Sequence, residues 1–271
     1  MDHPISDQEI YLQRMSKPLR EKLRVARFIP GAAERILDVG SADGTVTLAL
    51  AGLFPRRHFL GIDLDAGFVQ RAAAAAADRG IANAAFENVY LRQLLGRPER
   101  YDAVLFVSVL HEFFSYGEGI SSVLKALADA HELLRPGGEL VIRDMILDEF
   151  TKHAKFQVAA IAGKIAADRS KDRLVADFTR MFGPLDSLYA LNHFLLKYMY
   201  VENWERECRE NYVPVTFEQY QQAFALLGME LQYRESYLLP FLHDKWAADF
   251  GLGEDELASL KSTGFLVARK R

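Results

Sequence analysis

A turn of small residues between a hydrophobic run and a helical pattern is the first sign of chemistry in this sequence. Residues 35–39 read Arg-Ile-Leu-Asp-Val, which is typical of a buried parallel strand. Gly40, Ala42 and Gly44 follow with almost no side chain, so the backbone can turn tightly there and a ligand can lie against it. A helix that begins near Thr45 would direct its unpaired N–H groups at the same spot, where they can bind an anionic group.

An acidic residue at the end of the next hydrophobic run completes a nucleotide-binding pattern. Asp63 ends that run and can accept hydrogen bonds from two ribose hydroxyls. A dinucleotide fingerprint places its glycines at positions i, i+2 and i+5. The small residues here lie at i, i+2 and i+4, and Thr45 occupies i+5. The spacing therefore argues against a dinucleotide ligand.

The same segment resembles a known family. The form acidic-x-Gly-x-small-x-Gly, which begins at Asp38, resembles motif I of the class I S-adenosylmethionine-dependent methyltransferases. Asp63 then resembles the acidic residue that ends their second strand. Residues 101–108 resemble the fourth strand, and residues 134–144 resemble the Pro-Gly-Gly turn that leads into the fifth. Four such matches in order imply that S-adenosylmethionine is the cofactor.

The resemblance also implies which residues contact the cofactor. Asn88 follows the third strand, where relatives recognise the adenine edge, and its amide offers both a donor and an acceptor. The usual Gly-Asp form is missing at this point, so Val89 or Tyr90 is an alternative. The residues expected at the cofactor are Asp38, Gly40, Ser41, Ala42, Gly44, Asp63, Leu64, Asn88, Val89 and Ser108.

Candidate catalytic residues follow the fourth and fifth strands. Methyl transfer from a sulfonium is an in-line displacement, so the protein must align the nucleophile and exclude water. A general base helps where the nucleophile carries a proton. His111, in the loop after strand four, is the candidate base, and Glu112 could orient it. A histidine that only borders the cofactor is the alternative. Asp144 ends strand five and could face the substrate or serve as a structural carboxylate.

Alternating strand and helix patterns predict the elements that hold these residues. We expect an α/β fold of the Rossmann-like, doubly wound type, with a mostly parallel seven-stranded sheet. Helices are expected near 45–53, 66–79, 90–95 and 118–134. A capping box at Thr216 begins a further helix that Gly228 ends. The strands are expected at 35–39, 58–62, 84–87, 101–107, 139–145, 231–239 and 264–268.

The alternation stops after Asp144, where a long helical pattern begins. We expect a helical segment at 1–33, a core at 34–147 and 214–271, and a helical insertion at 148–213. Both ends of the insertion should lie near the carboxyl edge of the sheet, so it is predicted to be a lid that closes over the acceptor.

Two sets of polar residues in the insertion are candidates for chemistry or for a solvated surface. His193 is its candidate catalytic residue, although a satisfied or exposed histidine is the alternative. Glu202 with Arg206, and Glu205 with Arg209, have the i, i+4 spacing that usually indicates a solvated helix face.

Composition excludes several classes of protein. The net charge is −4 and the isoelectric point is about 6.0, so no global positive field attracts nucleic acid or anionic lipid. Cys208 is the only cysteine, which excludes an intrachain disulfide and a multi-cysteine zinc site. We expect no metal site. The start of the chain lacks the apolar core of a signal peptide, and no stretch has the length of a transmembrane helix. These observations predict a cytoplasmic protein without a membrane partner.

The sequence leaves three functions open. The first is methyl transfer to an oxygen, nitrogen or carbon nucleophile of a small organic molecule. The second is an RNA-modifying methyltransferase, because Lys and Arg residues recur in 152–173, although Asp168 and Asp172 interrupt them. The third is a subunit that binds S-adenosylmethionine without catalysis. The acceptor and the oligomeric state, for which a homodimer is one option, cannot be read from the sequence.

Overall fold

The computed structural model describes residues 19–271. The predicted N-terminal helical segment is therefore seen only in part, and residues 1–18 lie outside the described residues. The short helix α2 (Leu19–Lys22) and the 3-10 turn η1 (Leu23–Phe28) precede the first strand. Within the described part of the chain, no helix is both long enough and apolar enough to cross a membrane.

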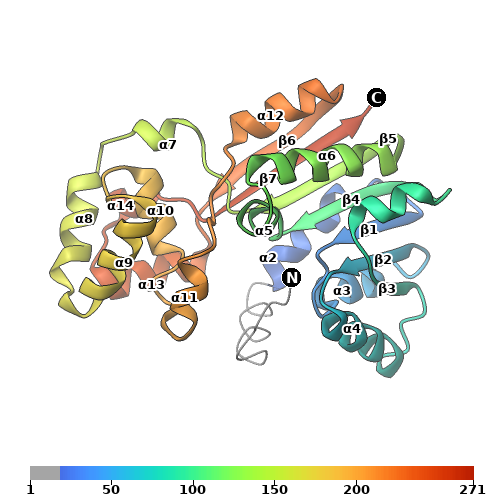
Figure 1. Ribbon diagram of the computed structural model, residues 1–271, viewed down its shortest axis with the longest axis horizontal. Helices are drawn as coiled ribbons and strands as arrows, with labels where there is room; N and C mark the ends of the chain where they lie inside the picture. The colour runs from blue at the N-terminus through green and yellow to red at the C-terminus, as the bar shows by residue number, and fades with distance from the viewer. Residues whose placement is uncertain (1–18) are drawn as a thin grey trace.

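A seven-stranded sheet forms the centre of one lobe (Figure 1). Its strand order is β3-β2-β1-β4-β5-β7-β6. The first five strands run parallel, whereas β7 is antiparallel to both of its neighbours, which confirms the predicted fold class. The strands are β1 (Arg35–Val39), β2 (His58–Asp63), β3 (Ala84–Asn88), β4 (Tyr101–Val107), β5 (Leu134–Asp144), β6 (Met229–Tyr237) and β7 (Thr263–Lys270).

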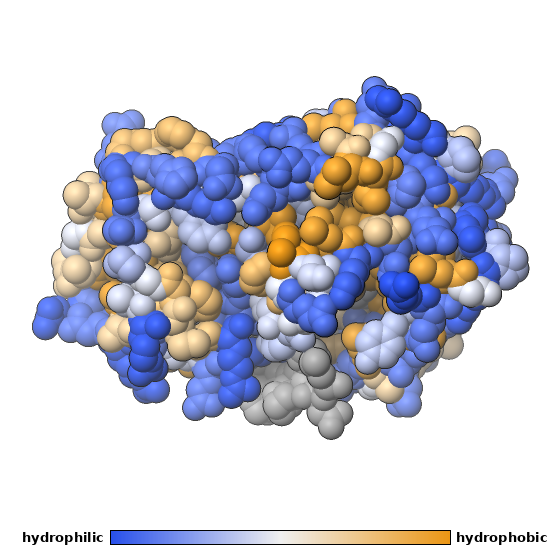
Figure 2. All heavy atoms as spheres, turned by 45° about the horizontal axis from the view of Figure 1, so that its top comes forward, coloured by the Kyte–Doolittle hydropathy of each residue, from blue (hydrophilic) through white to orange (hydrophobic). Residues whose placement is uncertain are grey.

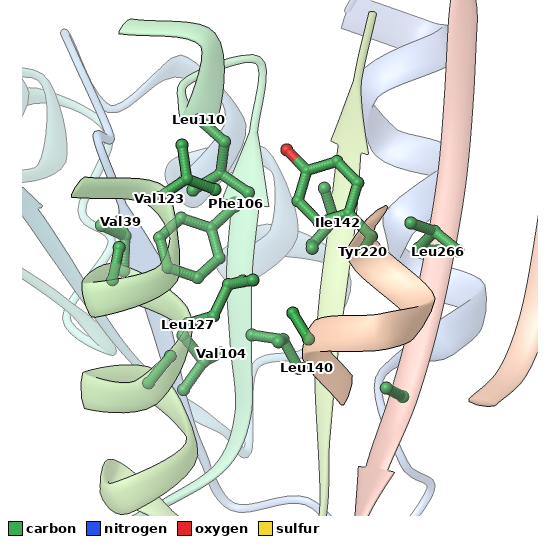
Figure 3. Close-up of a cluster of buried hydrophobic side chains, with 14 of the residues drawn as sticks. Val39, Val104, Phe106, Leu110, Val123, Leu127, Leu140, Ile142, Tyr220 and Leu266 are labelled. Carbon is green, nitrogen blue, oxygen red and sulfur yellow. The ribbon is translucent and has the colours of Figure 1, made fainter. Parts of the chain in front are cut away.

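Helices cover both faces of the sheet, which is why its central strands read as continuous apolar runs. On one face, α6 (Ile120–Leu133) and α12 (Phe217–Leu226) pack on β4 and β5. Figure 3 shows Phe106, Leu127 and Ile142 in this layer, and all three are fully buried. The other face carries α3 (Thr45–Leu53), α4 (Ala66–Asp78) and the turn η1.

Some predicted boundaries shift. The Thr216 capping box is present, because Gln219 N donates to the Thr216 hydroxyl and Thr216 N donates to the Gln219 side chain. Strand β6 begins at Met229, two residues earlier than expected, directly after Gly228 turns the chain at φ +68°. Helix α5 (Leu110–Tyr116) forms where a loop was expected.

A second lobe is helical and contains the predicted insertion. Its first piece comprises α7 (Phe150–His153), α8 (Val158–Ala167), η3 (Arg169–Lys171), α9 (Asp172–Phe182), α10 (Leu188–Leu195), η4 (Val201–Asn203) and α11 (Trp204–Glu207). The second piece is α13 (Pro240–Phe250) and α14 (Glu254–Ala258), which lie between β6 and β7. The sequence patterns had assigned no structure to these two helices.

One hydrophobic cluster joins the two pieces of the helical lobe. Phe178 and Phe194 from the first piece share it with Leu242, Trp246 and Phe250 from the second. All five side chains are buried. The helical lobe therefore has its own core, built from two segments that are distant in the sequence.

On the face drawn in Figure 2, hydrophilic side chains cover most of both lobes and separate smaller apolar groups.

Candidate active site

The turn after β1 has the left-handed backbone that small residues allow. Gly40, Ala42 and Gly44 have φ values of +71°, +46° and +76°. A Cβ atom at Gly40 would lie 2.3 Å from Val109 Cγ2, and one at Gly44 would lie 2.7 Å from the Phe86 ring. The glycines are therefore required by the close approach of protein side chains as well as by the turn.

Asp63 lies beside this turn at the end of β2. One of its carboxylate oxygens accepts from Ala42 N at 2.8 Å, and the other accepts from Asp65 N at 2.9 Å. Burial raises the pKa of the carboxyl, and these backbone donors oppose the increase. The next residue, Leu64, exposes 56% of its surface, so an apolar side chain stands open at the edge where the ligand is expected.

Asn88 ends the third strand beside Asp63, and Val89 follows it. Asn88 pairs with Asp63 in the parallel register, and its side-chain amide donates to the Asp63 carbonyl at 3.0 Å. That leaves the exposed Asn88 oxygen available to a ligand. Val89 packs partly against the core. The predicted adenine contacts thus lie next to the predicted ribose contact.

Asp38 faces into the protein. It is 2% exposed, and Thr47 donates to it at 2.6 Å, so it ties β1 to helix α3. Burial raises its pKa to about 6, while the Thr47 hydroxyl and the charge of Lys22 act against the increase. The structure brings Asp38 to the base of the turn.

His111 and Asp144 form a buried pair at the carboxyl ends of β4 and β5. His111 Nδ1 lies 2.9 Å from Asp144 Oδ1, and the backbone N–H groups of His111 and Met145 also donate to this carboxylate. Burial disfavours the imidazolium, but the charges of Asp144, Glu112 and Glu210 outweigh it and raise the pKa of His111 to about 9. The pKa of Asp144 is lowered, because these donors outweigh its burial.

His111 borders a cavity of about 160 Å³ between the sheet and the helical lobe. Ser108, Glu112 and Met145 continue the wall on the sheet side. Ser108 has a left-handed backbone, with φ +59°, and its hydroxyl accepts from Arg143 at 2.7 Å. The remaining walls come from Lys22, Arg143, Leu196, Tyr200, Asn203, Arg206, Glu207, Glu210, Tyr212, Leu239, Phe241, Leu242, Ser262 and Thr263.

Two buried cations in this wall were missed by the sequence analysis. Lys22 and Arg143 are each 3% exposed. Burial and the neighbouring Arg143 lower the pKa of Lys22 to about 8, while Asp38, Asp43 and Asp144 oppose the decrease. No motif marked these residues, since α2 lies outside the family pattern and Arg143 looked like an ordinary strand residue.

The helical lobe supplies a charged wall that includes Arg206. Of the four residues predicted on a solvated helix face, Glu202, Glu205 and Arg209 are exposed, whereas Arg206 is half-buried. Arg206 lines the cavity, where its Nε donates to Glu210 Oε1 at 2.7 Å and its guanidinium lies 3.6 Å from Glu112. Tyr116 also donates to Glu210 at 2.5 Å. Burial and the charge of Glu210 raise the pKa of Glu112 to about 7, against the effects of His111 and Arg206. Glu112 therefore faces the lobe, and Asp144 is the group that orients His111.

The structure does not bring His193 to the cavity. It is 1% exposed, its ring packs against Phe178 and Phe182, and its Nε2 accepts from Tyr212 N at 3.2 Å. Burial and the nearby Lys197 charge keep its pKa well below the ordinary value. These contacts suit a neutral histidine that holds the backbone of Tyr212 in place.

The residues around the turn also fit a charged nucleotide-like cofactor. Ser41 Oγ and Arg143 Nε are buried and have no hydrogen-bond partner among the described residues. Unpaired buried polar atoms are costly, and a polar ligand that reached from the turn at Ser41 to the cavity wall at Arg143 would satisfy both. In the described part of the chain, no group of three or more His, Cys, Asp or Glu side chains could hold a metal ion.

Comparisons with known proteins point to one kind of domain. Residues 37–140 match a family model described as a methyltransferase domain. The probable methyltransferase ltbC of Aspergillus luteorubrus is 31% identical over 120 residues, which is 42% of this chain and 41% of that protein. The residues matched by the family model include the turn after β1.

Solved structures share the fold at low identity. The mitomycin 7-O-methyltransferase MmcR matches 99% of this chain and 59% of its own with a TM-score of 0.58 at 14% identity. The [4+2]-cyclase SpnF matches 93% of this chain and 80% of its own with a TM-score of 0.54 at 17% identity. Because the two have different activities, likeness at this level defines the fold and leaves the reaction to the site.

Proposed function

We propose that this chain, whose residues 37–140 match a methyltransferase domain, is an S-adenosylmethionine-dependent methyltransferase that acts on an oxygen nucleophile of a small organic acceptor. The acceptor would bind between the sheet and the helical lobe, where the two lobes enclose the cavity. The helical lobe would then act as the lid that excludes water and selects the acceptor.

The His111–Asp144 pair is the observation that carries this proposal. Asp144 is fixed by three N–H donors and holds the proton of His111 on Nδ1. The Nε2 atom has no hydrogen-bond partner among the described residues, and His111 lines the cavity. This is the arrangement of a general base that a carboxylate orients. A hydroxyl is the acceptor group that gains most from it.

The cofactor would occupy the edge of the sheet beside His111. S-adenosylmethionine supplies an electrophilic methyl group and a neutral leaving group when it is bound. Asp63 would accept from its ribose hydroxyls, and Leu64 with Asn88 would contact the adenine. Ser41 and Arg143 would complete its charged end, because each has an unpaired buried atom.

The protonation state of His111 sets the pH at which it can act. With a pKa of about 9, the ring is an imidazolium at neutral pH and must lose a proton before it can accept one. A positive charge held beside the ring lowers that pKa. His111 is therefore expected to work as a base at neutral to alkaline pH once the cofactor side of the cavity is filled.

The basic residues of 152–173 give little support to an RNA acceptor. Lys152 pairs with Glu149, Lys164 pairs with Glu256 and Arg173 pairs with Asp177, so acidic neighbours neutralise the strip. Phosphate binding needs positive charge that is free to replace counterions. This charge balance favours a small molecule.

Transfer of a labelled methyl group tests the proposal. S-adenosylmethionine with a ¹³C-methyl group is supplied with matched acceptors, such as 2-naphthol and 2-naphthylamine, and the carbon spectrum identifies the methylated atom. We expect O-methyl product, and we expect His111→Asn to slow its formation by about 10²–10⁴-fold. His131→Asn, at a half-buried histidine on α6, is the control. An N-methyl product, or full activity in His111→Asn, would contradict the proposal.

A further inference from the structure

The lobe wall opposite His111 contains a second pair of polar residues, Glu207 and Tyr212. Both line the cavity. The Tyr212 hydroxyl donates to Glu207 Oε2 at 2.5 Å, and the Tyr212 ring lies edge-on to the His111 ring with 5.4 Å between centroids. The pair therefore adjoins the place where the proposed function puts the reacting oxygen.

Glu207 has capacity for a further hydrogen bond. Glu207 is 5% exposed, and the carboxyl oxygen that does not bind Tyr212 has no hydrogen-bond partner among the described residues. A buried carboxyl that faces a cavity costs free energy unless a donor satisfies it. Burial and the charge of Glu210 raise its pKa to about 7, against the Tyr212 hydroxyl, Lys197 and Arg206. The Glu207 carboxyl can thus accept a hydrogen bond from a neutral donor without carrying a full negative charge in a buried place.

A fully buried lysine holds this pair in place. Lys197 Nζ donates to the carbonyls of Glu207 and Glu210, which lie at and just after the end of α11. The same ammonium lies 4.8 Å from the centre of the Tyr212 ring and 4.2 Å from that of Phe182. A buried cation with these partners fixes the backbone on either side of the pair, so the pair is preorganised for binding.

Part of the chamber wall is apolar, and charged side chains such as Arg143 and Arg206 form other parts of it. Met145, Leu196, Leu239 and Leu242 line it, and Phe241 stands at its exposed side. The apolar part of the wall can contact a flat aromatic ring, and the polar groups around it then decide the orientation of that ring. His111 is one of these groups, and the Glu207–Tyr212 pair is another.

We infer that Glu207 and Tyr212 form a second recognition point, which selects aromatic acceptors that carry a further hydroxyl or amine besides the nucleophilic oxygen. The inference rests on the proposed function for the placement of the nucleophile. A site that is built to bond a hydroxyl rejects the analogue without it, because the buried carboxyl is then left unpaired.

Dissociation constants in the presence of S-adenosylhomocysteine test the inference without requiring turnover. The probes are 2-naphthol, 2,7-dihydroxynaphthalene and 7-amino-2-naphthol, titrated by calorimetry. We expect at least one disubstituted probe to bind about tenfold more tightly than 2-naphthol. In Glu207→Leu that preference should disappear, and Glu207→Gln should retain part of it.

Glu205→Leu is the matched control, because Glu205 is an exposed carboxylate on the same helix and should keep the preference. Tight binding of a disubstituted probe without methylation would leave this inference standing and would contradict the proposed function. Equal binding of all probes by the wild type, no binding of any probe, or an unchanged preference in Glu207→Leu would overturn the inference. If Glu207→Leu does not fold, Tyr212→Phe, which removes only the hydroxyl, must reduce the preference.

Discussion

At the scale of single residues, the His111–Asp144 pair decides how the site responds to pH. Its two side chains come from β5 and from the helix after β4, yet both are almost completely buried. Burial alone would keep His111 neutral at pH 7. The carboxylate at 2.9 Å reverses that preference, so the two residues act as one unit.

The pH dependence of activity should report this unit. Because His111 must be neutral to accept a proton, kcat/KM for S-adenosylmethionine, which reports the free enzyme, should rise about tenfold per pH unit and level off near the pKa of about 9. Asp144→Asn removes the main charge that raises this pKa, so the inflection should move to lower pH and the plateau should fall. Stopped-flow or steady-state rates from pH 6 to pH 10 measure both effects. A flat profile, or an unmoved inflection in the variant, would be inconsistent with His111 as the base.

The same pair should make stability depend on pH. The folded pKa of about 9 lies above the ordinary value of about 6.5, so the folded state binds the proton more tightly than the unfolded state does. The stabilisation is fully present below pH 6.5 and is lost as the pH rises to about 9. The difference in unfolding free energy between wild type and His111→Asn, measured by urea denaturation, should therefore narrow as the pH rises from 6.5 to about 9. A difference that grows with pH would contradict the sign of the shift.

Asp63 is the residue with the clearest expected effect on the cofactor. Asp63→Ala should weaken S-adenosylhomocysteine binding by about tenfold to a hundredfold, because hydrogen bonds to a charged group contribute about 1.5–3 kcal/mol. Asp78→Ala, on the exposed end of α4, is the control. Since Asp63 also accepts from Ala42 N, a small loss of thermal stability should accompany the change. If calorimetry gave the same affinity for wild type and Asp63→Ala, Asp63 would not be a cofactor-binding residue.

At the scale of elements, the turn after β1 shows how local residues determine a site. Its left-handed glycines, the strand before it and Asp63 beyond it could be predicted, because each depends on a few neighbouring residues. Packing contacts between residues that are distant in the sequence could not be predicted in this way. Val109, which fills the space beside Gly40, is distant in the sequence, so its contact depends on the tertiary fold.

Gly40→Ala tests this turn. The added methyl would overlap Val109 in a left-handed backbone, so we expect a loss of about 1–3 kcal/mol in unfolding free energy and weaker cofactor binding. Val109→Ala in the same chain should restore part of the loss by removing the overlap. Gly31→Ala has open space around its Cβ and serves as the control. An unchanged denaturation midpoint in Gly40→Ala would show that the turn tolerates the methyl group.

Several other features of the structure could not be predicted from the sequence, for physical reasons. Helix α5 starts directly after β4 without a side-chain cap, so no capping signal marked it. Arg206 was expected on a solvated face but lines the cavity, because the i, i+4 charges of a helix do not reveal which face meets a neighbouring lobe. No sequence motif identifies Lys22 or Arg143 as a site residue. The tertiary fold brings both side chains to the cavity wall, so only the structure identifies them.

At the scale of the whole molecule, the helical lobe is one unit made from two segments. Trp246 and Phe250 of α13 are buried in the same hydrophobic cluster as Phe178 and Phe194, so neither piece can be removed alone without exposing apolar surface. The helices of 148–213 and those between β6 and β7 therefore form one candidate lid.

Truncated chains should show this dependence. Replacing 148–213 by a short linker exposes the α13 side of the cluster, so we expect an aggregation-prone protein that binds a hydrophobic dye. A chain that also loses 239–261 can close β6 onto β7 with a tight hairpin, because Tyr237 and Thr263 are paired across the two strands. This second chain should be monodisperse in size-exclusion chromatography and retain S-adenosylhomocysteine binding. Equal solubility of the two truncated proteins would indicate that the pieces are independent.

In the proposed mechanism, the reacting methyl group lies beside His111 in the cavity between the lobes. The most direct measurement is a nuclear Overhauser contact between the ¹³C-labelled methyl of bound S-adenosylmethionine and histidine ring protons. The account predicts a contact to one histidine, which disappears in His111→Asn and remains in His131→Asn. A bound cofactor whose methyl shows no histidine contact, or a contact that persists in His111→Asn, would contradict it.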